Sequence, residues 1–279
     1  MRTPAAVPAP GPRVLPGALS PLTADLVRGA RRPAVVLAVG RFGAYLGAHG
    51  RVLPVLSQDA VALPGALRLT EPSATLDLGL AVGDVVVVGG GCVRTPGATV
   101  RGVRTWRPAR VRAGSACSTS LPGARPLLAA AVGDLDPWLA AGVDGCLRAV
   151  DPYAAVAGLV GRGEGLTPAG DDALAGALLL RRALDLAPPA RADDALVAAV
   201  RARLHATTAV SASLLDAAAG GWAAREVVAL LDAVVHGGAS AVRAALPAVL
   251  AIGHTSGRDL VTGLLAALDA LVPSGRIAA

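Results

Sequence analysis

The spacing of hydrophobic positions changes about midway along the chain. Between residues 32 and 112, short runs rich in β-branched residues, such as AVVLAV and GDVVVVGG, alternate with glycine and proline. Such runs predict strands, and turn candidates at Gly43, Gly50, Gly83 and Gly89 separate them irregularly. This pattern favours a compact antiparallel sheet or barrel over βαβ units.

Beyond about residue 126 the apolar runs lengthen and follow the 3.6-residue period of helices. Gly237 and Gly238 occupy positions where a helix would stop, and Pro247 is expected to kink or break the helix around it. This half of the chain therefore predicts a helical bundle. The expected helices cover residues 134–149, 152–160, 171–186, 193–219, 222–236, 240–252 and 258–272.

The change of period divides the chain into three expected parts. Residues 1–20 are expected to form a flexible Pro/Ala-rich tail, residues 21–125 a mainly antiparallel β domain, and residues 126–279 a helical domain. The boundary is expected within 113–126, AGSACSTSLPGARP. The predicted fold class is therefore α+β, and 279 residues with 53% hydrophobic composition supply ample material for a core.

Charge adds one further candidate surface. The formal net charge is +6, and every basic side chain is Arg because the sequence contains no lysine. Signatures of nucleic-acid-binding folds are missing and aromatic residues make up only 2%, so we expect no nucleic-acid partner. On a strand, the arginines between residues 94 and 112 would share one face, which is either a solvated face or an anion-attracting surface or subunit contact. These arginines are Arg94, Arg101, Arg104, Arg107, Arg110 and Arg112.

Targeting and redox features point to a cytoplasmic location without a membrane partner. The N-terminal stretch has no apolar run of signal-peptide length, and no later segment reaches about 18 uninterrupted apolar residues. Cys92, Cys117 and Cys146 are odd in number and far apart, with no CxxC spacing. They therefore indicate neither a disulfide framework nor a zinc site.

The richest motif is GRGEGLTPAGDD at residues 161–172, just before an apolar helical run. Gly163 and Gly165 allow backbone conformations closed to other residues and let the chain approach a ligand closely. Thr167 and Pro168 then fix a turn into the helix. Because helix N-termini bind anions, the motif predicts a phosphate or carboxylate site.

Two adjacent carboxylates modify this interpretation. Asp171 and Asp172 would repel an anion unless an arginine, a proton or a metal offset them, and Mg²⁺ bridging a phosphate to either side chain is one consistent solution. Both residues are therefore candidate metal ligands, and Mg²⁺ is the one cofactor considered. The alternative is that they only favour the start of the helix, as aspartates in a first turn commonly do.

Part of the motif recurs near the C-terminus. Gly170-x-Asp172-x-x-x-Gly176 reappears as Gly257-x-Asp259-x-x-x-Gly263, each with a Thr shortly upstream. We infer that the two helix starts converge on one site with Asp172 opposite Asp259, and that the second glycine of each copy lets another helix or a ligand come close. Alternatively, Ser256 and Asp259 form a capping box and the glycines merely permit helix crossing.

Hydroxyl groups lie between the two copies, in RARLHATTAVSASLLDAAAGG. Thr207 and Ser211 are either satisfied by backbone carbonyls or line the wall of the site. The candidate catalytic residues are Asp171, Asp172, His254 and Asp259, of which His254 would act as a general base. Candidate ligand-binding residues are Gly163, Gly165, Leu166, Thr167, Pro168, Gly170, Thr207, Ser211, Thr255 and Ser256.

Three segments resemble, in order, the C-terminal motifs of the AllH-like family, named for a subunit of oxamate carbamoyltransferase. They are GRGEGLTPAGDDALAGALL, TTAVSASLLDAAAGG and AIGHTSGRDLVTGLLAAL, and the resemblance is weak before residue 126. Ala169 replaces a Ser common in the family, and Ala173 replaces an aromatic residue. The resemblance implies membership in a multi-polypeptide system of allantoin breakdown, in which a carbamoyl group passes between oxalurate and phosphate.

The expected function is that of an enzyme or enzyme subunit transferring a carbamoyl or related acyl group to or from phosphate. Its partners would be an anionic small molecule and other protein subunits. The alternative is a non-catalytic interaction subunit, in which the motif packs helices and the arginine-rich face docks a partner. A third class, nucleic-acid binding through the arginine-rich segment, would show a steep salt dependence.

Overall fold

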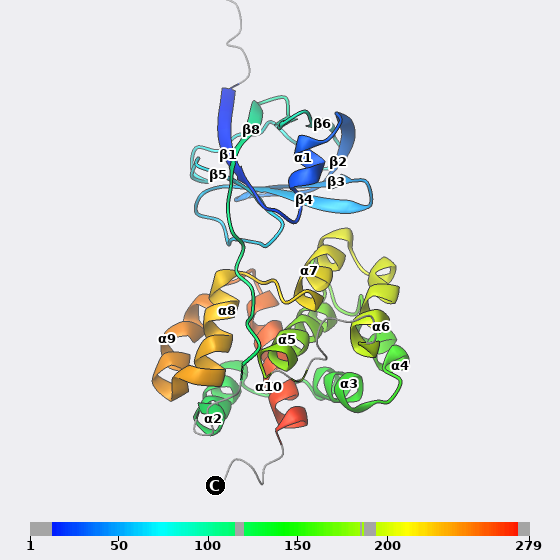
Figure 1. The fold of residues 1–279 in the computed structure, drawn as a ribbon, viewed down its shortest axis with the longest axis vertical. Helices are drawn as coiled ribbons and strands as arrows, with labels where there is room; N and C mark the ends of the chain where they lie inside the picture. Colours follow the sequence, from blue (N-terminus) through cyan, green and yellow to red (C-terminus); the bar gives the residue numbers. More distant parts are fainter. Residues whose placement is uncertain (1–12, 115–119, 185, 187–193, 273–279) are drawn as a thin grey trace, which may run out of the picture. The chain divides into compact units, whose positions relative to one another are not determined.

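The chain folds as two compact units in the computed structural model, which describes residues 13–114, 120–184, 186 and 194–272 (Figure 1). The first unit runs to Ala60 and continues over Gly65–Arg107. The second contains Val61–Pro64 and everything from Pro108 onward. It therefore begins before the boundary expected at 113–126, because the stretch after Arg107 pairs with the helical unit.

The described part of the first unit is a closed barrel of eight strands. Strand order around the barrel is β1-β5-β4-β3-β2-β6-β7-β8, with β8 returning to β1. The β1–β8 and β4–β5 pairs are parallel and the others antiparallel, so the predicted mainly antiparallel β domain is confirmed and, of the two expected forms, sheet or barrel, it is the barrel. The elements are β1 (Arg13–Leu19), α1 (Ala24–Arg28), β2 (Arg32–Gly40), β3 (Gly43–Ala48), β4 (Arg51–Leu56), β5 (Leu67–Leu69), β6 (Val85–Gly89), β7 (Cys92–Arg94) and β8 (Ala98–Thr105).

Strand β1 corrects the expectation of a flexible tail over residues 1–20. Pro16 and Gly17 give this stretch the composition of a loop, yet Leu15 and Leu19 are buried in the barrel core. A Cβ at Gly17 would lie 2.8 Å from Leu67 Cδ1, so the glycine lets β1 pack closely on its neighbour. The strand forms through pairing with distant strands, which the local sequence does not reveal. Residues 1–12 lie outside the described residues.

The second unit is a bundle of helices, which completes the predicted α+β fold. Its central helix is α5 (Ala169–Ala183), in which Gly170 through Leu180 are all buried. Such a helix has no solvent face, so its neighbours surround it on every side. The other elements are α2 (Ser120–Val132), α3 (Pro137–Arg148), α4 (Tyr153–Leu159), α6 (Ala195–Arg203), η1 (Leu204–Ala206), α7 (Ala209–Ala219), α8 (Arg225–Asp232), η2 (Ala233–Gly237), α9 (Gly238–Leu250) and α10 (Ser256–Leu271).

Two parts of the helical unit differ from the helices expected from the periodicity. The single helix expected over 193–219 is interrupted by η1, and α7 starts anew because Thr208 Oγ1 accepts a hydrogen bond from Ser211 N at 3.0 Å. Helix α2 was not expected, because Pro122 and Pro126 hide its apolar period. Pro122 falls in the first turn, where the missing N–H matters little.

The helical run Arg225–Leu250 corrects two further expectations. Gly237 and Gly238 do not end it: the chain passes through the π-helical turn η2 directly into α9, with Gly238 at φ +73°. Pro247 does not break α9, which continues to Leu250. The run spans 26 residues and, by length and composition alone, is the described helix that could cross a membrane. Val227, Leu230 and others on its inward side belong to the helical core.

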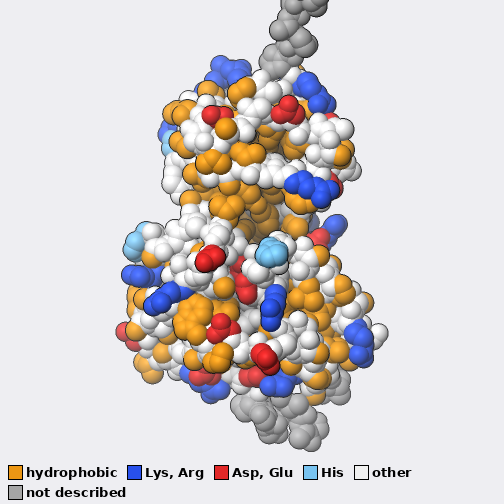
Figure 2. Space-filling view, turned by 180° about the vertical axis from the view of Figure 1, so that it is seen from behind, with side chains coloured by type: hydrophobic (Ala, Val, Ile, Leu, Met, Phe, Trp, Pro, Cys, Tyr) orange, Lys and Arg blue, Asp and Glu red, His pale blue; other side chains and the backbone are white. Residues whose placement is uncertain are grey.

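The arginines between residues 94 and 112 do not share one sheet face. Arg94, Arg101 and Arg104 are exposed on β7 and β8, whereas Arg110 belongs to the second unit and packs on Trp222. On the face drawn in Figure 2, basic side chains are scattered among acidic and apolar ones.

The described cysteines are free and buried. They are Cys92 and Cys146, and burial raises the pKa of the Cys146 thiol to about 12. Cys117 lies outside the described residues.

Candidate functional site

The glycine loop before α5 is folded by its glycines. Gly161, Gly163 and Gly165 have φ values of +77°, +122° and +85°, in the region that favours glycine. A Cβ would lie 2.2 Å from Ala206 O at Gly161 and 2.5 Å from Ala169 N at Gly163, whereas the space around Gly165 is open. The first two glycines therefore let the loop pack against its neighbours, whereas at Gly165 only the backbone conformation requires glycine.

The start of α5 already uses most of its own donors. Gly170 N donates to Arg162 O at 2.9 Å, and Asp171 N and Asp172 N donate to Pro168 O at 2.9 and 3.1 Å. The N–H of Gly170, which was expected to bind an anion, therefore donates to the glycine loop instead. Within the described residues, the N–H groups of Gly163, Glu164, Gly165 and Leu166, in the exposed part of the loop, make no hydrogen bond. The N–H groups of Thr167 and Ala169 make none either.

Asp171 is a buried anchor whose two carboxylate oxygens are both occupied. Oδ1 accepts a hydrogen bond from Gly161 N at 2.8 Å. Oδ2 accepts from Ser211 Oγ at 2.6 Å and from Thr207 Oγ1. The hydroxyls of Thr207 and Ser211 therefore donate to a carboxylate. The principal expectation was that they would donate to backbone carbonyls. Together these contacts tie the glycine loop, α5 and the start of α7 to one another.

The neighbouring Asp172 has the opposite character. Its side chain is buried, and Oδ2 has no hydrogen-bond partner within the described residues. Burial raises the pKa of Asp172 to about 7, the hydroxyls of Ser256 and Thr167 act in the lowering direction, and the charges of Asp259 and Asp171 raise it further. This carboxyl group therefore exists in both protonation states near neutral pH.

The two helix starts meet, as the repeated motif predicted. Thr167 Oγ1 and Ser256 Oγ lie 2.7 Å apart, and Asp259 is close enough to influence Asp172. Asp259 itself is half-buried, and burial raises its pKa against the opposing effects of the Thr255 hydroxyl and the Arg258 charge. No described side chain caps α10, so the capping box considered for Ser256 is not formed.

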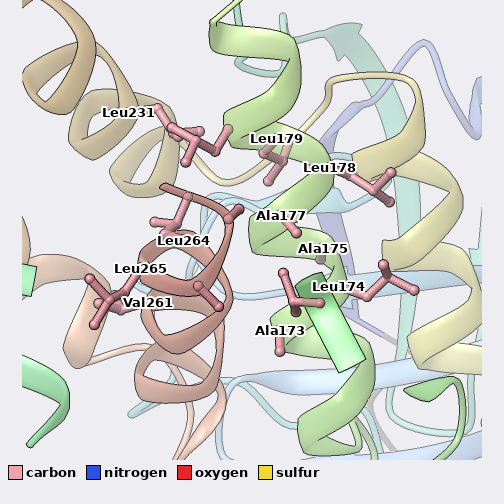
Figure 3. Packing of buried hydrophobic residues seen from close by; sticks show 14 of the residues in the cluster. Ala173, Leu174, Ala175, Ala177, Leu178, Leu179, Leu231, Val261, Leu264 and Leu265 are labelled. Atoms are coloured by element: carbon pink, nitrogen blue, oxygen red, sulfur yellow. The ribbon is translucent and has the colours of Figure 1, made fainter. Parts of the chain in front are cut away.

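Glycine contacts hold α5 and α10 together. A Cβ at Gly176 would lie 2.3 Å from Leu260 O, and one at Gly263 would lie 1.9 Å from Ala173 O. The helix backbones thus touch at both glycines, which confirms the predicted close packing. Figure 3 shows the apolar side chains of the two helices, including Ala173 and Leu264, gathered in one cluster.

Residues at the edge of the site are accessible. His254 and Thr255 are exposed in the turn before α10, and Leu166 is 46% exposed in the glycine loop.

One further contact at the start of α10 had no local signal in the sequence. Arg258 donates from Nε and Nη2 to Val132 O at 3.0 and 2.6 Å, which fixes the start of α10 to the last turn of α2.

The described residues offer few protein ligands for the Mg²⁺ ion that the sequence left open. Both oxygens of Asp171 accept hydrogen bonds, and Asp172 is held in a setting that favours its neutral form. Among the described residues, no group of three or more His, Cys, Asp or Glu side chains could hold a metal ion.

Comparison with known proteins identifies the same region. The family model described as oxamate carbamoyltransferase subunit AllH matches residues 159–268, which include the glycine loop, α5 and the start of α10. No solved structure matches the chain at a significant level. The resemblance to the AllH family is thus confirmed for the part of the helical unit that carries the candidate site.

Proposed function

We propose that this chain is a subunit of an enzyme of the oxamate carbamoyltransferase type and binds an anionic substrate where α5 and α10 meet. The observation that carries the proposal is Asp172: a buried carboxyl group with an unpartnered oxygen and a pKa of about 7, beside a glycine loop. Perturbed acids of this kind cluster at functional sites. The AllH match covers the same residues.

The proposed chemistry needs a group that both gives and takes a proton. When phosphate oxygen attacks the carbamoyl carbon of oxalurate, a C–O bond forms and the C–N bond to oxamate breaks. The leaving nitrogen must gain a proton, and the attacking phosphate must lose one. Protonated Asp172 donates to the leaving nitrogen, and its carboxylate then accepts the proton of the phosphate hydroxyl, so that the residue ends in its starting state.

The glycine loop supplies the proposed binding groups for the anion. The unpaired N–H donors of Gly163, Glu164 and Gly165 are fixed by the loop conformation before any ligand arrives. Donors fixed in this way stabilise developing negative charge without reorganisation. Thr167 and Ser256 position Asp172 through their hydroxyls, and Asp171 holds the loop in place.

A non-catalytic interaction subunit is the competing proposal. Gly176 and Gly263 serve helix packing and Asp171 serves as an anchor, so much of the motif has a structural role. A packing role alone gives no reason for the unpartnered oxygen of Asp172, because an apolar side chain would fill the position without the cost of burying a carboxyl group. The enzyme proposal accounts for both sets of residues.

The setting of the enzyme is also proposed. The AllH description names a subunit, so we propose that the chain works together with other protein subunits. We further propose a cytoplasmic location, in keeping with small anionic substrates of nitrogen breakdown.

Thermal unfolding of the purified chain tests the proposal. Carbamoyl phosphate, inorganic phosphate and oxamate are added singly, and oxamate is also combined with carbamoyl phosphate. A ligand at about one hundred times its Kd adds roughly 2.7 kcal/mol to the free energy of unfolding. We expect stabilisation by oxamate or carbamoyl phosphate that is reduced in Asp172→Asn and kept in the control Asp232→Asn, whose side chain is exposed on α8. Equal stabilisation of both variants would contradict the assignment of Asp172.

A further inference from the structure

Two arginine side chains rest on one turn near the other end of α5. The turn is Gly220–Trp222, between α7 and α8. Arg110 Nε donates to Gly220 O at 3.1 Å, and its guanidinium carbon lies 4.9 Å from the centre of the Trp222 ring. A Cβ at Gly221 would lie 2.3 Å from Nε of Arg182, so this second side chain lies directly against the same turn.

The backbone around the turn fixes both arginines. Val111 N donates to Gly221 O at 2.8 Å, and Arg182 Nε donates to Val111 O at 3.4 Å. Gly221 has φ +79° and leaves the room that Arg182 occupies. Each guanidinium therefore donates from Nε to the backbone, and its terminal nitrogens make no hydrogen bond within the described residues.

Neither guanidinium has a carboxylate partner in the described part of the chain. Seven other arginines there form ion pairs with aspartate or glutamate. Burial lowers the pKa of Arg182, and the charge of Arg110 lowers it further. Two like charges held together in this way are relieved by an anion that binds both of them.

We propose that Arg110 and Arg182 form a binding site for a phosphate group, with Trp222 as its aromatic wall. The planar guanidinium donors suit the oxygens of a phosphate, and stacking on the indole ring orients Arg110. Arg182 and Asp172 are ten residues apart on α5, which corresponds to about 15 Å along the helix. The phosphate site is thus separate from the candidate site at the glycine loop and does not depend on the proposed function.

Trp222 provides a local reporter for this site. The chain has three tryptophans, so protein labelled with 5-fluorotryptophan gives three ¹⁹F resonances, and Trp222→Phe assigns one of them. Inorganic phosphate is titrated at constant ionic strength. We expect a saturable shift of the Trp222 resonance, with a Kd that rises about tenfold or more in Arg110→Gln and in Arg182→Gln.

Controls separate this site from general charge effects and from the glycine loop. Arg112→Gln removes the same charge from an exposed position two residues from Arg110, and its Kd should stay within about twofold. Asp172→Asn should leave the titration unchanged, whatever its effect on carbamoyl transfer. An unresponsive Trp222 resonance, or an unchanged Kd in Arg110→Gln, would overturn the proposal. Because Arg110 is exposed, that variant decides the question if Arg182→Gln fails to fold.

Discussion

The hydroxyl oxygens of Thr167 and Ser256 lie 2.7 Å apart, although 89 residues separate the two in sequence. Thr167 precedes α5 and Ser256 is the first residue of α10. Their contact places both hydroxyls beside Asp172, whose pKa they help to set. The repeated motif thus assembles one site from two distant segments.

Asp172→Asn should make the protein more stable at neutral and alkaline pH. The pKa of Asp172 is raised in the fold from 3.8 to about 7, so its protonated form is favoured there. Its contribution to stability is full below about pH 4 and is lost as the pH rises to about 7, whereas asparagine stays neutral throughout. In urea unfolding, the free energy of unfolding of the variant relative to that of the wild type should rise by on the order of 2–4 kcal/mol between about pH 4 and pH 7.

The control for this pH dependence is the exposed Asp232→Asn variant, whose difference from the wild type should stay nearly constant across the same pH range. If Asp172→Asn instead tracked the wild type at every pH, Asp172 would titrate as an ordinary surface carboxylate.

Glycine-to-alanine variants should separate the two kinds of helical glycine. Gly176→Ala and Gly263→Ala place a methyl group within 2.3 and 1.9 Å of a carbonyl oxygen, so each should lower the free energy of unfolding by about 1–3 kcal/mol or more. Gly158→Ala on α4 meets no atom within 4 Å and should raise it by up to about 1 kcal/mol, through helix propensity. Equal effects at all three positions in thermal unfolding would argue against the close crossing of α5 and α10.

Asp171→Ala should destabilise the fold strongly, because it leaves three donors without their acceptor. We expect a loss of roughly 3 kcal/mol in the free energy of unfolding. Ser211→Ala removes one of those donors, so the double variant should lose less than the sum of the two single variants. Additive losses would mean that the Ser211 to Asp171 hydrogen bond contributes nothing.

Local patterns were sufficient for the fold class and for the meeting of α5 and α10. The change from β-branched runs to helical periods predicted a sheet or barrel followed by a bundle. The repeat of Gly-x-Asp-x-x-x-Gly predicted the convergence of the two helix starts and the close packing at the glycines. Such features are local in sequence, and their spacing fixes which side chains share a helix face.

Features that depend on partners far away in the sequence could not be predicted from local patterns. Strand β1 contains Pro16 and Gly17 and is recognisable only by its pairing with β8 and β5. Asp171 and Asp172 are adjacent and chemically identical. Asp171 nevertheless accepts hydrogen bonds from three donors outside its own helix, whereas Asp172 has no donor at Oδ2 within the described residues. Only the fold decides which of the two becomes an anchor and which keeps a titratable oxygen.

The protonation of Asp172 tests the central claim most directly. Carboxyl-carbon NMR of protein labelled with ¹³C-aspartate gives a titration curve for each residue, and the curve missing from Asp172→Asn belongs to Asp172. We predict a midpoint near pH 7 that shifts when oxamate and carbamoyl phosphate are added together. A midpoint near pH 4, or one that no ligand moves, would contradict the account, because Asp172 would then be neither the proton-exchanging group nor part of a ligand site.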